Sequence, residues 1–194
     1  MFLQDILFYF KLGWSHIVSF DALDHQLFIL ALVVVYTFRQ IKQVLILVTA
    51  FTIGHSLTLA LSVFDIVRFP SVWVEFLIPC TIFITALFNI LRKEKKQHKV
   101  ELNYYLALFF GLIHGMGFAN SIRMMLAKDQ HIGWGLFGFN AGLEVGQIVF
   151  VILFLVVSFV LINVFKVKKR DWVMFVSSAV FALALQMSLE RLPF

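Results

Sequence analysis

The sequence predicts an all-α membrane protein, and three observations support that fold class. The chain has 194 residues, of which 61% are hydrophobic and only 14% are charged, and its mean hydropathy is +0.94. A soluble domain of this length has too little interior to hide so much apolar surface, so lipid must form part of its surroundings. Backbone polar groups in lipid need partners within the protein, which leaves helices or closed barrels. The apolar runs are continuous rather than alternating, which favours helices.

The apolar runs divide into a six-span helical bundle within one transmembrane domain, residues 1–194. Each span is close to the ~20 residues that a helix needs to cross a bilayer. The predicted spans lie near residues 22–38, 41–64, 71–91, 102–125, 136–163 and 172–189.

A short apolar segment precedes the first span. Residues 1–10 contain Gln4 and Asp5 and have neither a basic start nor a small-residue cleavage site, so a signal peptide is not predicted. The segment is also too short to span, and we predict a short interfacial N-terminal helix at the outer membrane surface. Its lipid-facing residues, at helical spacing, would be Phe2, Leu3, Ile6, Leu7 and Phe10.

The positive charge indicates a topology. Eleven of the 16 Lys and Arg residues lie in the first, third and fifth links between spans. The positive-inside rule therefore places these links in the cytoplasm and both termini outside, in a bacterial-type inner (cytoplasmic) membrane. The net charge of +5 is explained in this way, so the predicted partner is the lipid bilayer and not nucleic acid. The lone cysteine, Cys80, excludes an intrachain disulfide and a thiolate metal cluster.

Several ionisable side chains lie within or against the apolar spans, where a charge or imidazole is costly and usually marks an ion, proton or substrate site. In the predicted topology they gather in the outer half of the membrane. The main metal-ligand candidates come from four separate spans: His25, His55, His114 and Glu144. Further ligand candidates are Asp24, His16 and Glu75. Side chains expected to support the ligands through hydrogen bonds are Asn140, Gln147 and Ser56.

The fifth span carries two distinct rows. Its polar stripe at i, i+4 and i+7 consists of Asn140, Glu144 and Gln147. A glycine row on another face, Gly138, Gly142 and Gly146, permits close approach of a neighbouring helix. Around His114, three further glycines indicate tight packing or backbone that approaches a ligand: Gly111, Gly115 and Gly117. Such rows are compatible with contacts in a homo-oligomer as well as within one chain.

The ligand types allow two functional classes. Imidazoles and carboxylates without thiolates suit divalent ions such as Ni, Co or Zn. A permease would strip water from an ion that arrives from the outside. An intramembrane zinc-type hydrolase would hold the metal with three ligands and use Glu144 or Glu75 as general base on a lipid or peptide substrate. A membrane scaffold with a structural polar network is a third interpretation. Sparse polar lining in the inner half, limited to Thr85, Asn89, Ser158 and Asn163, weakens the permease interpretation.

Five ordered motifs also carry a family resemblance. They are Gly13–Val18 followed by Asp24–Phe28, then Thr49–Leu59, Val74–Glu75 with Asn89 downstream, Phe110–Ala119, and Phe139–Gln147. Together these motifs, within residues 13–150, resemble the HupE/UreJ family of hydrogenase and urease accessory membrane proteins. The resemblance implies nickel or cobalt uptake that supports metalloenzyme maturation. It implies metal residues at His16, Asp24, His25, His55, Glu75, His114 and Glu144. Seven residues separate His16 from Asp24, a longer spacing than in many members, so the place of His16 in the same site stays open here.

Overall fold

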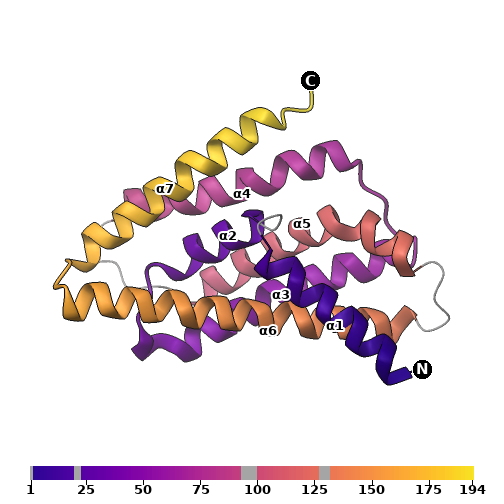
Figure 1. Cartoon of the computed structure of the whole chain (residues 1–194). Coiled ribbons are helices and arrows are strands. Elements are labelled where there is room, and N and C mark those ends of the chain that lie inside the picture. The colour runs from indigo at the N-terminus through magenta and orange to yellow at the C-terminus, as the bar shows by residue number, and fades with distance from the viewer. Residues whose placement is uncertain (1, 20–22, 93–99, 127–131) are drawn as a thin grey trace.

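The computed structural model describes residues 2–19, 23–92, 100–126 and 132–194, and in these ranges the chain forms helices and no strand. The α-helices are α1 (Phe2–Val18), α2 (Leu23–Val33), α3 (Ile41–Val63), α4 (Ser71–Leu91), α5 (Val100–Leu126), α6 (Ile132–Phe159) and α7 (Lys169–Glu190). A 3₁₀ turn, Phe38–Gln40, precedes α3, and a π-helical turn, Val160–Val164, follows α6. The predicted all-α class is therefore confirmed (Figure 1).

Four helices of the described residues are long and apolar enough to cross a membrane, judged by length and composition. They are α3 with its 3₁₀ turn, α4, α6 with its π turn, and α7. The helices α1 and α2 meet the criterion only as a pair, bent by 67°. The test covers the described residues alone and so leaves out parts of α5. The predicted count of six spans stays a prediction.

The predicted single helix over residues 22–38 is wrong. The helix α2 ends at Val33 and has 11 residues, which at 1.5 Å per residue cover about half of the ~30 Å hydrocarbon core. It ends where Val33, Val34 and Val35 follow one another, because a β-branched run has low helix propensity. By length and composition, this part of the chain meets the criterion for a span only when α1 and α2 are taken together.

The helix α1 packs along α6 through backbone contacts at glycine. A Cβ added at Gly142 would lie 2.0 Å from the carbonyl oxygen of Phe10, and one at Gly13 would lie 2.0 Å from the carbonyl oxygen of Phe139. Only glycine permits so close an approach. The glycine row predicted to receive a neighbouring helix thus receives α1.

This packing corrects the set of residues expected to face lipid on the N-terminal helix, whose place at the membrane surface stays a prediction. The backbone of Ile6 lies against Gly138, and that of Phe10 lies against Gly142. Both side chains are half-buried, whereas Leu3 and Leu7 are exposed as expected. The face that carries Ile6 and Phe10 therefore packs on α6. The side chain of Phe2 lies outside the described residues.

A second glycine-mediated contact joins α3 and α5. A Cβ added at Gly111 would lie 2.2 Å from the carbonyl oxygen of Phe51, and one at Gly115 would lie 2.3 Å from that of His55. The tight packing predicted around His114 is confirmed, and it fixes the helix of His55 against the helix of His114. Because both glycine rows are used within the chain, they give no support to the predicted homo-oligomer, which stays a prediction.

The helices α4 and α7 run antiparallel and are joined at one end by Arg170. Its guanidinium donates to the carbonyl oxygen of Asn89 at 3.2 Å and to that of Ile90 at 2.8 Å. The last carbonyls of a helix have no partner within it, and a cation is favourable at that end. Arg170 therefore caps the C-terminus of α4.

Replacing Arg170 with glutamine is expected to lower the free energy of unfolding by about 1–2 kcal/mol, because two charge-assisted hydrogen bonds to half-buried carbonyls are lost. Thermal unfolding in detergent measures this change. The exposed Arg39 provides the control, since Arg39→Gln removes the same charge. Equal melting temperatures for the two variants would contradict the capping role.

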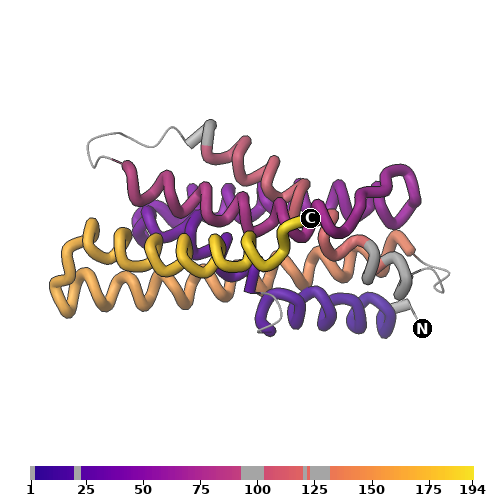
Figure 2. The backbone as a smooth tube through the Cα atoms, turned by 90° about the horizontal axis from the view of Figure 1, so that it is seen from above, coloured from indigo at the N-terminus to yellow at the C-terminus, as the bar shows by residue number. Residues whose placement is uncertain are grey.

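Two of the described links between helices lie at opposite ends of the bundle. The α3–α4 link lies at the end that holds the N-terminus, and the α6–α7 link lies at the opposite end (Figures 1 and 2). The second link carries Lys166 and Lys168, whereas the first carries the ion pair of Asp65 with Arg68. The difference in Lys and Arg content between these two links is in the direction that the positive-inside rule uses. Which end faces the cytoplasm stays a prediction.

Candidate metal centre

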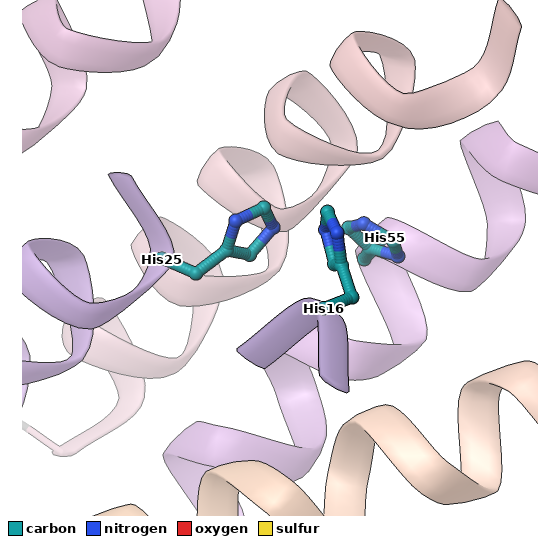
Figure 3. Close-up of side chains that lie close together, drawn as sticks. All are labelled: His16, His25 and His55. Carbon is teal, nitrogen blue, oxygen red and sulfur yellow. The ribbon is translucent and has the colours of Figure 1, made fainter. Parts of the chain in front are cut away.

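Three histidines from three helices lie together in the bundle (Figure 3). His16 comes from the end of α1, His25 from the start of α2 and His55 from the middle of α3. Their ligand nitrogens all lie within 4.8 Å of one another. A metal–nitrogen bond is about 2.1 Å, so two nitrogens on one ion are at most about 4.2 Å apart. Small rotations of the rings would let a single ion bind all three residues. We call His16, His25 and His55 the histidine group.

The junction of α1 and α2 places two of these rings face to edge. The ring centroids of His16 and His25 are 4.7 Å apart, with planes at 71°. Gln26, next to His25, donates from Nε2 to the carbonyl oxygens of Ile17 (2.9 Å) and Ser19 (3.0 Å). These two bonds tie the start of α2 to the end of α1. The bend between α1 and α2 therefore also brings His16 close to His25.

Four ring nitrogens of the group are buried without a hydrogen-bond partner among the described residues. His55 is fully buried, and His25 is 6% exposed. Both ring nitrogens of His55, and Nε2 of His25 and of His16, have no hydrogen-bond partner among the described residues. Leaving a buried polar atom unpaired is costly, and such atoms in native proteins call for an explanation. A metal ion bound by these nitrogens would satisfy them.

His114 lies beside the histidine group and is oriented by a contact with Thr81 on α4. Its ring centroid is 5.3 Å from that of His25, and the side chain is fully buried. Nε2 pairs with the hydroxyl of Thr81 on α4 at 3.1 Å, while Nδ1 has no partner among the described residues. The Thr81 contact sets the orientation of the ring and leaves Nδ1 as its available ligand atom.

Aromatic rings enclose the four imidazoles. Phe51 stacks on Phe28 at 4.8 Å, and its ring lies 5.2 Å from that of His114. On the other side Phe118 lies 4.1 Å from His16 and stacks on Phe139 at 5.3 Å. These rings offer no hydrogen-bond acceptor to an imidazole and exclude water. They strengthen any electrostatic interaction at the centre, because the local dielectric is low.

The acidic candidates Asp24 and Glu75 differ in burial and in their partners. Asp24 is half-buried, with Oδ2 3.0 Å from Nη1 of Arg191 and Oδ1 buried without a partner among the described residues. Glu75 is exposed on α4. Among the described residues the three-ligand group contains histidines alone, so neither carboxylate lies within it.

Glu144 belongs to a different contact, between α6 and α3. Its Oε1 accepts from the hydroxyl of Thr49 at 2.8 Å. One turn away, Gln147 contacts the hydroxyl of Thr52 at 2.9 Å through its amide oxygen, and its Nε2 is buried without a partner among the described residues. Since Thr49 and Thr52 precede His55 on α3, this polar contact lies next to the histidine group and is distinct from it.

The remaining polar candidates contact their own helix or lie nearby. Asn140 donates from Nδ2 to the carbonyl oxygen of Leu136 at 3.0 Å, and its Oδ1 is buried without a partner among the described residues. Ser56 follows His55 on α3 and is half-buried. Neither hydrogen bonds to a histidine ring among the bonds described.

Four contributors could not be found by reading the sequence: Gln26, Thr49, Thr81 and Arg191. Gln26 lies within a motif but carries no charge to single it out. Thr81 meets a histidine 33 positions away, and Arg191 meets Asp24 across 167 positions. Threonine is common in apolar helices, so only the folded contacts reveal these roles.

Comparison with known proteins gives one match. The family model described as HupE / UreJ protein matches residues 2–191, nearly the whole chain. Neither the comparison with curated proteins nor that with solved structures finds a match.

Proposed function

The chain belongs to the HupE/UreJ family, and from this membership and the histidine group we propose that it is a membrane permease for a divalent transition-metal ion. The family is associated with nickel or cobalt uptake or an accessory role. Nickel and cobalt are therefore the first candidates as transported substrate, with zinc after them. Imidazole nitrogens suit all three ions.

One observation carries this proposal: three histidines converge, and each has a buried ring nitrogen without a partner among the described residues. Structural histidines in membrane helices are normally satisfied by a neighbouring helix. Here each of His16, His25 and His55 offers a ligand nitrogen within 4.8 Å of the others. Each also has at least one buried ring nitrogen without a partner among the described residues. We assign these three as direct ligands. His114 would accept the ion through Nδ1, either as a fourth ligand or as the next position.

Polar side chains on α4 lie between His114 and the end of the bundle that holds the Lys-bearing α6–α7 link. They support onward movement of the ion from the histidines. On α4, Thr81, Thr85 and Asn89 recur every four residues and so share one face. The stripe begins at the hydroxyl that holds His114 and ends at Asn89, whose amide donates to the carbonyl oxygen of Ala31 at 2.6 Å. The contacts of Glu144 with Thr49 and of Gln147 with Thr52 add oxygen ligands next to the histidines.

The orientation in the membrane is part of the proposal. The histidine group would open to the outer side of a bacterial-type inner membrane, with both termini outside. The Lys-bearing α6–α7 link lies at the end of the bundle away from the N-terminus, and the sequence concentrates Lys and Arg in alternate links, which supports this orientation. Asp24 and Glu75 would then meet an ion first, as carboxylates near the outer end of their helices.

An intramembrane metallohydrolase is the second candidate, because three histidines with an open position are also a ligand set of catalytic zinc. It needs a carboxylate beside the metal as general base. The two candidates do not meet that need in the described residues, since Glu144 accepts from Thr49 and Glu75 is exposed. The permease is therefore the better supported function.

Uptake of a radioactive nickel or cobalt tracer into proteoliposomes tests the proposal. The expected result is saturable uptake by the wild-type protein and uptake near the empty-vesicle background for His25→Ala. The variant Arg39→Gln, altered at an exposed position away from the histidines, should transport normally. Metal binding without any flux, together with hydrolysis of a lipid or peptide, would replace the permease with the hydrolase.

A further inference from the structure

Arg191 links the end of α7 to the residue that precedes a proposed ligand. It is the residue that follows α7, and its backbone N–H closes the last turn on Met187. Its Nη1 lies 3.0 Å from Oδ2 of Asp24 on α2 and 3.5 Å from the carbonyl oxygen of Glu75 on α4. A cationic side chain therefore pairs with the residue that directly precedes His25.

Asp24 is only half satisfied by this ion pair. Oδ2 pairs with Arg191, whereas Oδ1 is buried and has no partner among the described residues. The next residue, His25, carries an unpaired Nε2 in the histidine group. Asp24 is thus a carboxylate with one oxygen bound to a guanidinium and another free for a different donor or cation.

We propose that Arg191 is a tethered competitor of the metal ion, which occupies Asp24 when the histidine group is empty and yields it when the ion binds. The inference rests on the proposed function, since it assumes that the histidine group binds a divalent cation. Arg191 would thereby set the affinity of the site and help to release the ion.

The physical basis is competition for one negative charge. A divalent ion at His25 is attracted by Asp24 and repelled by a guanidinium nearby, and both effects are strong where water is excluded. The ion pair itself is partly open to water, with side chains 34% and 19% exposed. An ion pair with such access is only modestly stable, so an arriving ion can displace the guanidinium. Removing one partner from a fully buried pair would instead leave an uncompensated buried charge, which is far more costly.

The experiment is calorimetric titration of purified protein with Ni²⁺ and Co²⁺ in wild type, Arg191→Gln and Asp24→Asn, and in the double variant. Removing the competitor should tighten binding about 5- to 10-fold, at the low end of the coupling usual between two sites. Asp24→Asn should weaken binding. In the Asp24→Asn background, Arg191→Gln should then have little effect, because the carboxylate for which the cations compete is absent.

The matched control is Arg68→Gln. Arg68 lies in the α3–α4 link and pairs with Asp65 there, so the substitution removes the same charge without touching Asp24. Its affinity should equal that of the wild type. If Arg191→Gln does not fold, Arg191→Lys keeps the charge but loses the planar guanidinium, and it should tighten binding by about 2-fold as its pairing with carboxylate is weaker.

Two results would overturn the inference. One is unchanged or weaker metal binding by folded Arg191 variants, and the other is equal tightening in the Asp24→Asn background. Either result with normal binding by the wild type removes the role of Arg191 alone. Absence of binding by the wild type would instead remove the proposed function.

Discussion

Replacing His55 with alanine is expected to abolish high-affinity binding of Ni²⁺ and Co²⁺. His55 is fully buried in the histidine group, and both of its ring nitrogens lack partners among the described residues. Loss of a residue that merely supports a ligand weakens a metal site about 10- to 100-fold, so loss of a direct ligand should cost at least about 100-fold. Calorimetric titration measures the affinity. Metal-induced stabilisation provides a second measurement, since saturating metal at 100 times Kd stabilises a folded protein by about 2.7 kcal/mol.

Phe51→Leu separates the ligand role of His55 from its packing role. Phe51 lies one turn earlier on α3, is also buried, and has its ring 6.3 Å from that of His55. Both substitutions remove buried ring atoms, but only one removes ligand nitrogens. We expect Phe51→Leu to lower the melting temperature while it keeps the metal-induced shift. Equal loss of metal binding in both variants would mean that the histidine acts through packing.

Much of the architecture could be predicted because lipid imposes one rule on every residue. The continuous apolar runs predicted the helices α3, α4 and α6 close to their observed bounds. The glycine row of α6 predicted a close contact with a neighbouring helix. The prediction of one helix over residues 22–38 was wrong, because hydrophobic periodicity does not reveal where a helix bends. Gln26 stabilises that bend through the carbonyl oxygens of Ile17 and Ser19, and a glutamine gives no such signal in sequence.

The candidate site shows the same division between chemistry and geometry. Costly side chains in apolar segments could be recognised one by one, and His16, His25 and His55 do converge. The separation of Glu144 from these histidines could not be predicted. The spacing of residues along α6 determines which of them share a face, but not which residue of another helix that face contacts. That neighbour is Thr49, whose hydroxyl donates to Glu144. Depth in the membrane thus identifies which residues share a layer, whereas helix rotation decides which of them touch.

Replacing Gly142 with leucine is expected to detach α1 from α6 and to weaken the metal centre from a distance. The first atom of the new side chain would lie 2.0 Å from the carbonyl oxygen of Phe10, and backbone cannot rotate away as a side chain can. Overpacking against side chains costs about 1–3 kcal/mol, so against backbone we expect a loss of stability at or above the upper end. Because α1 carries His16, displacement of α1 should also lower the affinity for Ni²⁺.

Gly133 supplies the matched control on the same helix, since a Cβ added there would meet nothing within 4 Å. Gly133→Leu should therefore keep both the melting temperature and the metal affinity. A further test combines Gly142→Leu with His16→Ala. If the glycine acts by placing His16, then His16→Ala should weaken binding in the wild-type background and much less in the Gly142→Leu background. Fully additive losses would show that α1 stays in place and that Gly142 affects the centre by another route.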